Sequence, residues 1–180
     1  PADMVLQHAL CDAVLLPALT PYLIYDNGAS LKGKGMAFTR RRLAAHLREY
    51  RRRYGTGGWV LKIDFAKFFD NIPHDRLIDS IDAKVRDSRI RDLLSMLLAP
   101  YSADVSYTDT DFDAVPYNSL QDFETSGLRD GSRVLRRSVG IGAPVSQIAG
   151  VWYPTPIDTY CKVVRSCRYY GRYMDDIYIL

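Results

Sequence analysis

Two adjacent aspartates, Asp175 and Asp176, stand near the end of the 180-residue sequence. Aromatic and β-branched residues precede and follow them, a pattern that predicts two strands joined by a tight acidic turn. Neighbouring carboxylates repel each other, so this arrangement is unfavourable unless a positive charge lies between them. Because hard divalent cations prefer oxygen ligands, the pair favours a metal site at the tip of a hairpin.

A third carboxylate, Asp64, ends a segment whose side chains alternate as they do in a strand. One face of this strand is predicted to carry Trp59, Leu61, Ile63 and Phe65, and the other Val60, Lys62 and Asp64. Taken alone, Asp64 also fits a helix cap or a turn. Together with the acidic pair, it indicates three carboxylates on two strands of one sheet.

The segment Tyr173–Asp176 resembles the catalytic hairpin of reverse transcriptases, and Asp64 with the following Phe-Phe-Asp-Asn-Ile-Pro-His resembles their first metal-binding motif. In the N-terminal region that resembles the fingers, the similarity is to the bacterial reverse transcriptases of group II introns, retrons and diversity-generating retroelements. The resemblance implies that Asp64 and Asp175 bridge two Mg²⁺ ions and that Asp176 completes the set. It also makes the backbone carbonyl of Phe65 a further ligand, and it allows Mn²⁺ in place of Mg²⁺.

Between the acidic motifs lies Gly140-Ile141-Gly142, followed by a largely apolar run, Ser146–Val164, with helical spacing that prolines interrupt. A single Gly-x-Gly is more often a turn than a nucleotide-binding loop. Reverse transcriptases place a similar loop against the incoming nucleotide, so the resemblance implies a backbone contact from Gly142. This chain has Ile141 where many members carry Gln, which removes a side-chain hydrogen bond to the nucleotide.

Phe69 lies five residues after Asp64, where reverse transcriptases place an aromatic ring beneath the sugar of the incoming nucleotide. A ring at that place leaves no room for a 2′-hydroxyl and offers it no hydrogen-bond partner, so the resemblance implies selection of deoxynucleotides. The alternative is that Phe68 and Phe69 are both ordinary core residues at the start of a helix.

Two lysines, Lys32 and Lys34, lie in a glycine-containing segment that resembles the fingers region of bacterial reverse transcriptases. Their charges on a flexible loop suit the triphosphate of a nucleotide or the phosphates of a nucleic acid. A solvated basic turn is the alternative for each of them. The resemblance further implies that Tyr173 of the acidic hairpin contacts nucleic acid.

A helix is predicted after Gly35, with one apolar face and several arginines on other faces. The apolar face comprises Met36, Leu43, Leu47, Tyr50 and Tyr54. Arg41, Arg48 and Arg52 lie on another face. Such a run is often only a solvated surface, but the density of arginine with a single nearby acid favours contact with phosphates.

The composition, 47% hydrophobic, allows one core or two small subdomains around one cleft. Residues 1–62 carry a net charge of +6 and residues 63–180 a net charge of −3. A basic half beside an acidic half suits a polymerase whose fingers hold nucleic acid and whose palm holds cations. We therefore expect an α+β fold, with a helical fingers-like basic region over residues 1–57 and a right-hand palm with an antiparallel sheet over residues 58–180.

The three cysteines, Cys11, Cys161 and Cys167, are odd in number and lack metal-binding spacing, which predicts free thiols in a reducing compartment. Neither a signal peptide nor an apolar run of membrane length is apparent, so a cytoplasmic protein without a membrane partner is expected. A core helix is predicted over Asp87–Leu98, and residues 101–133 are expected to form a long loop.

The sequence starts at Pro1 and ends at Leu180, whereas reverse transcriptases continue with a thumb. The resemblance therefore implies a fragment without a thumb, with little or no activity alone and with a tendency to self-associate. The implied reaction is RNA-directed DNA synthesis by two-metal nucleotidyl transfer, with an RNA template, a DNA or RNA primer and dNTPs as partners. The alternatives are an RNA-copying or template-independent polymerase of the same fold, and an RNA-binding module that assists splicing.

Overall fold

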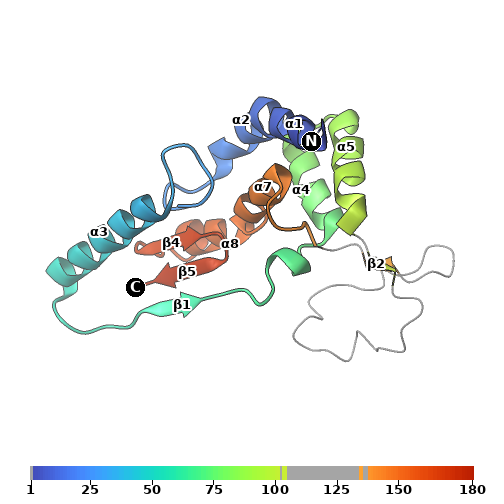
Figure 1. The fold of residues 1–180 in the computed structure, drawn as a ribbon. Coiled ribbons are helices and arrows are strands. Elements are labelled where there is room, and N and C mark those ends of the chain that lie inside the picture. The colour runs from blue at the N-terminus through green and yellow to red at the C-terminus, as the bar shows by residue number, and fades with distance from the viewer. Residues whose placement is uncertain (1, 102, 105–133, 136–137) are drawn as a thin grey trace. The chain divides into compact units, whose positions relative to one another are not determined.

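The computed structural model describes residues 2–101, 103–104, 134–135 and 138–180 (Figure 1). The chain forms two compact units, each made of two separate stretches. The first unit is Pro1–Ala18 with Ala66–Ser146, and the second is Leu19–Phe65 with Gln147–Leu180. Helices combine with a small antiparallel sheet, so the predicted α+β class is confirmed. The functional division after residue 57 and the right-hand palm remain predictions.

The first unit is mainly helical. Its elements are α1 (Ala2–Leu10), η1 (Cys11–Leu15), η3 (Phe69–Asn71), α4 (His74–Val85), α5 (Ser88–Leu98), η4 (Ala99–Tyr101) and the antiparallel strand pair β2 (Ala103–Asp104) and β3 (Val134–Leu135). The short helix α2 (Leu16–Leu19) continues into the second unit. Most of the loop predicted for residues 101–133 lies outside the described residues.

The helix predicted over Asp87–Leu98 is confirmed as α5. Asp87 caps it, because its side chain accepts a hydrogen bond from the backbone nitrogen of Arg89 at 2.9 Å. α5 packs against α4, and both helices bury apolar side chains that recur at helical spacing. The buried side chains are Leu77, Ile78, Ile81, Leu94 and Leu98.

The second unit contains the acidic motifs. Its elements are η2 (Thr20–Tyr22), α3 (Met36–Tyr54), β1 (Leu61–Ile63), most of α7 (Pro144–Trp152), α8 (Thr155–Thr159), η6 (Tyr160–Val164), β4 (Tyr170–Tyr173) and β5 (Asp176–Ile179). The strands form one antiparallel sheet in which β5 lies between β1 and β4 (Figure 1). β4 and β5 form a hairpin closed by the pairing of Tyr173 with Asp176, which confirms the predicted strands and acidic turn.

β1 is shorter than the alternating segment of the sequence, and among the described strands only β5 pairs with it. It is therefore an edge strand, with one row of backbone groups outside the ladder. The apolar side chains at its start stay outside the core, since Trp59 is 92% exposed and Leu61 54% exposed. Further along, Ile63 is half-buried opposite Ile177 of β5.

The helix predicted after Gly35 is confirmed as α3, and its apolar face is only partly buried. Three members of that face are at least 44% exposed: Met36, Leu47 and Tyr54. The buried residue of the helix is His46, and Arg42 and Glu49 lie on the same side of the helix. This buried side of α3 meets polar partners, which apolar periodicity does not reveal.

One helical stretch, Asp3–Tyr22, has the length and hydropathy of a membrane span, and 28% of it is buried. The expectation that no apolar run of this length is present is therefore wrong. The stretch contains few charged side chains, and the expectation did not take this into account. Core helices of soluble proteins pass the same test of length and composition, so nothing follows from it for the location of the protein.

Candidate functional site

The β4–β5 hairpin presents Asp175 and Asp176 at its turn. Met174 takes the first central position of this two-residue turn with a φ of 53°. Hairpin turns commonly require a positive φ there, and the position favours glycine. A methionine in this conformation costs free energy that the surroundings must offset. The turn leaves Asp175 half-buried and Asp176 exposed at the first position of β5.

The register of the sheet brings Asp64 to the same end as the hairpin turn. In the β1–β5 ladder, Lys62 pairs with Tyr178 and Ile63 with Ile177. One further step in this register would set Asp64 opposite Asp176. Like charges that face each other across two strands are destabilising, which agrees with the end of the ladder at Ile63.

A cation lies in the field of all three carboxylates. The Nζ atom of Lys62 is 3.0 Å from Oδ1 of Asp176. This hydrogen bond and the charge of Asp176 raise the pKa of Lys62, and the charges of Asp64 and Asp175 raise it further. Lys62 is thus paired with Asp176, and its ammonium group also feels the charges of Asp64 and Asp175.

The donors of these residues suit a hard divalent cation, because all of them are carboxylate oxygens. As arranged, however, no three His, Cys, Asp or Glu side chains among the described residues are placed to hold a metal ion together. A bound ion would have to take the place of the Lys62 ammonium beside Asp176. Convergence of the three carboxylates on Mg²⁺ or Mn²⁺ stays a prediction.

Replacement of Lys62 by alanine is expected to strengthen Mn²⁺ binding about two- to fivefold, since an exposed ion pair competes only weakly. The change removes both the competing ammonium and its repulsion of the incoming ion. Free Mn²⁺ measured by electron paramagnetic resonance gives the affinity. Lys62→Arg is the matched control, because it keeps the positive charge and should bind Mn²⁺ like the unaltered chain. Unchanged or weaker binding by Lys62→Ala would contradict the competition.

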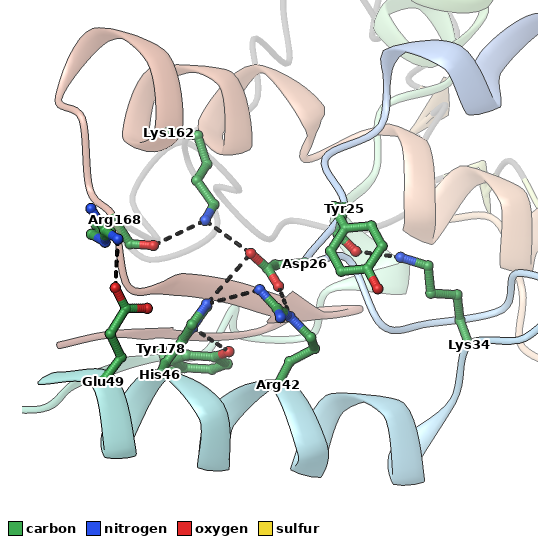
Figure 2. A network of polar contacts seen from close by, with 9 residues as sticks. All are labelled: Tyr25, Asp26, Lys34, Arg42, His46, Glu49, Lys162, Arg168 and Tyr178. Atoms are coloured by element: carbon green, nitrogen blue, oxygen red, sulfur yellow. Dashed lines mark hydrogen bonds and ion pairs between the residues drawn. The ribbon is translucent and has the colours of Figure 1, made fainter. Parts of the chain in front are cut away.

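A polar network ties β5 to α3 (Figure 2). Its centre is the buried carboxylate of Asp26, which accepts from Nε of Arg42 at 2.5 Å and from Nζ of Lys162 at 3.0 Å. Nε2 of His46 lies 3.6 Å from the same carboxylate. On its other side, Nδ1 of His46 is 3.1 Å from the hydroxyl of Tyr178, a residue of β5. The strand that carries Asp176 is thereby fixed against the helix.

The protonation states of the groups in this network follow from their burial and from their hydrogen bonds to charged partners. Burial acts to raise the pKa of Asp26, but hydrogen bonds from Arg42 and Lys162 outweigh it and lower that pKa. Burial lowers the pKa of His46 and raises the pKa of Tyr178 to about 12. At neutral pH the network therefore holds an ionised Asp26 between two cations, with a neutral imidazole and a neutral phenol beside it.

The segment around Asp26 also pairs with the outer edge of β4. The backbone nitrogen of Arg172 donates to Asp26 O at 3.0 Å, and that of Gly28 donates to Arg172 O at 2.8 Å. Gly28 is packed tightly, since a Cβ there would lie 1.9 Å from Oγ1 of Thr39 and 3.6 Å from Cδ2 of Tyr173. The half-buried ring of Tyr173, predicted to contact nucleic acid, thus lies beside this segment.

The two lysines predicted to bind nucleotide differ in their surroundings. Lys32 is exposed. Lys34 donates to the carbonyl of Tyr25, and its Nζ atom lies 4.6 Å and 4.2 Å from the ring centroids of Tyr25 and Phe38. Burial lowers the pKa of Lys34. A phosphate would have to draw Lys34 out of these contacts, whereas Lys32 is accessible as it stands.

Phe65 is half-buried and follows Asp64 at the end of the second unit's first stretch. Phe69 and Gly142 belong to the first unit. A backbone hydrogen bond joins the segments that contain them, because the nitrogen of Val139 donates to the carbonyl of Phe69 at 3.1 Å. Gly142 has a φ of 99° and open space around it, as a close backbone contact requires. These two predicted nucleotide contacts therefore lie in neighbouring segments.

The arginines predicted to bind nucleic acid, Arg41, Arg48 and Arg52, are all exposed on α3. No salt bridge to any of them is present in the part of the chain that the structure describes. Arg42 differs, because it turns inward to Asp26. The outer side of α3 thus offers guanidinium groups suited to phosphates, while its inner side uses its charges within the protein.

Comparison with known proteins gives no family for this chain. No protein-family model matches it, and no curated protein sequence matches it significantly. The functional assignment accordingly depends on the acidic hairpin, on Asp64 and on their place in the sheet.

Proposed function

We propose that the chain carries the fingers and palm of an RNA-directed DNA polymerase similar to bacterial reverse transcriptases. One observation carries the proposal: the acidic hairpin and Asp64 lie at the same end of one antiparallel sheet. Neighbouring carboxylates are unfavourable without a cation. A two-metal phosphoryl-transfer site explains why they are there.

In this proposal Asp64, Asp175 and Asp176 hold the ions together with the carbonyl of Phe65. When bound, Mg²⁺ supplies activation of the primer 3′-hydroxyl and neutralisation of the triphosphate charge. The chain's own groups bind and orient the substrates. The exposed arginines of α3 hold template phosphates, and Lys32 holds the triphosphate.

A second candidate is an RNA-binding module. The exposed arginines on the outer side of α3 favour it, because phosphate contact needs no catalytic carboxylate. The two candidates differ in metal dependence. Primer extension requires Mg²⁺ or Mn²⁺, whereas phosphate contact by arginine does not.

Primer extension on an RNA template with a DNA primer and dNTPs tests the proposal. The assay is run on the 180-residue chain and on any longer protein that contains it, with Mg²⁺, Mn²⁺ or a chelator. Extension that the chelator abolishes supports the polymerase. RNA binding without extension under every metal condition favours the RNA-binding module.

Replacement of Phe69 by alanine is expected to relax discrimination between dNTPs and NTPs while DNA synthesis largely persists. Phe68 is 8% exposed whereas Phe69 is half-buried, so Phe69 is the more accessible ring of the pair. Loss of the ring leaves space for a 2′-hydroxyl. The ratio of incorporation efficiencies measures the effect, with Phe68→Leu as the matched core control. An unchanged ratio in Phe69→Ala, or an unaltered enzyme that prefers NTPs, would favour the RNA-copying alternative.

A further inference from the structure

Arg172 of β4 is a fully buried arginine directly before the acidic hairpin turn. It pairs in register with Ile177 of β5, so its side chain enters the face of the sheet that carries Ile177. The guanidinium and the carboxylate of Asp158 in α8 are both 0% exposed. Ionised groups are rarely buried completely, and such burial requires every donor to be satisfied.

All five N–H groups of the Arg172 guanidinium have acceptors. Nε and Nη2 donate to the carboxylate of Asp158 at 2.8 and 2.6 Å, and Nη2 also donates to Val151 O at 2.8 Å. Nη1 donates to Gly150 O at 3.3 Å and to Met174 O at 2.8 Å. Gly150 and Val151 lie in the last turn of α7, where carbonyls lack partners within the helix.

The contact with Met174 reaches the turn itself. The carbonyl of Met174 belongs to the peptide that leads into Asp175, and Met174 has a left-handed φ that a non-glycine residue rarely adopts. A hydrogen bond to that carbonyl fixes the plane of the peptide. It thereby limits the directions in which the carboxylates of Asp175 and Asp176 project.

We propose that Arg172 is a positioning residue that holds the hairpin turn in the conformation in which Asp175 and Asp176 bind metal. This inference rests on the proposed function, because it assumes that these carboxylates are the ligands. Arg172 touches neither ion nor substrate. It acts through the Met174 carbonyl, as groups behind metal ligands commonly do.

A purely structural role for Arg172 makes a different prediction. If the guanidinium only neutralised the charge of Asp158, Arg172→Lys would keep a positive charge there and lose only part of the packing. Metal affinity would then be unaltered. Lysine has three donors on one nitrogen and no planar fork, so it cannot hold Asp158, the end of α7 and the turn together. A measurement of metal affinity therefore distinguishes the positioning role of Arg172 from a purely structural role, whereas a measurement of stability does not.

The test is Mn²⁺ binding to the 180-residue chain, with Mn²⁺ alone as the probe and thermal unfolding recorded in parallel. Arg172→Lys is expected to weaken Mn²⁺ binding roughly 10- to 100-fold while the variant remains folded, the range typical for loss of a group that orients metal ligands. Arg168→Lys is the matched control, since it changes an exposed arginine of the same unit, and it should bind like the unaltered chain.

A folded Arg172→Lys variant with unaltered Mn²⁺ affinity overturns the positioning role. If Mn²⁺ binding is lost in Asp175→Asn but kept in Arg172→Lys, the proposed function stands and only this inference falls. If the unaltered chain has no Mn²⁺ site that Asp175→Asn removes, both fall.

Backbone ¹⁵N relaxation of the unaltered chain covers the case in which Arg172→Lys does not fold. Order parameters of about 0.85 at residues 174–176 support a held turn, and values below about 0.6 overturn it.

Discussion

Asparagine at Asp175 or at Asp176 is expected to lower primer extension on an RNA template at least about a hundredfold, the order of effect found when one charge-stabilising group is removed from an active site. The substitution keeps the size of the side chain and removes one anionic ligand. Metal capture should weaken, while the basic surface proposed to contact RNA is unchanged. RNA affinity of each variant should therefore equal that of the unaltered protein.

The matched control for these substitutions is Asp70→Asn. Asp70 is exposed, follows Asp64 by six residues and is assigned no ligand role. Primer extension by this variant should be close to that of the unaltered protein. A parallel loss of RNA affinity in Asp175→Asn and Asp176→Asn would contradict a metal-ligand role and favour the RNA-binding module.

Alanine at Asp158 is expected to lower the free energy of unfolding by about 3–5 kcal/mol, because it leaves the buried guanidinium of Arg172 without its counter-charge. Asp158 and Arg172 are both inaccessible to water, so solvent cannot compensate the loss. The hydroxyl of Tyr170 also loses its acceptor in this variant. Urea denaturation monitored by circular dichroism measures the difference.

Asp79→Ala is the control for the buried pair. It breaks an ion pair with Arg91 in which Asp79 is 62% exposed, and exposed pairs contribute little to stability. If the effect of Asp158→Ala is as small as that of Asp79→Ala, the account of a buried and indispensable counter-charge is wrong.

The sequence was sufficient to predict the local elements of the site. Aromatic and β-branched residues before and after the acidic pair correctly predicted the hairpin, and the prolines within residues 146–164 correctly marked the break between α7 and α8. Such elements follow from neighbours in sequence. The length of β1 could not be predicted, because it depends on which strands pair with it. In the described sheet only β5 does so.

Polar contacts between distant segments were not predictable in the same way. His46 lies in a helix whose apolar residues pointed to another face, and its partners Asp26 and Tyr178 are far from it in sequence. No spacing rule links such residues. Apolar periodicity also does not reveal that the buried side of a helix is polar.

The sequence contains a weak indication that Arg172 is buried in an ion pair. Arg172 is the one charged residue of a strand that otherwise consists of tyrosines and a glycine, and Asp158 is the only acid in the largely apolar run 146–164. A single acid and a single base, each within an apolar element, suit a buried pair. The reach of Arg172 to the Met174 carbonyl became apparent only from the structure.

Mn²⁺ titration of three single variants tests the central claim most directly, namely that Asp64, Asp175 and Asp176 form one metal site. Asp64→Asn, Asp175→Asn and Asp176→Asn are compared with the unaltered chain and with Asp70→Asn by electron paramagnetic resonance of free Mn²⁺. We predict that all three ligand variants lose the same Mn²⁺ site, because each removes one charge from a shared set of oxygen donors. Unaltered Mn²⁺ binding by Asp64→Asn, with loss in the two hairpin variants, would contradict the claim.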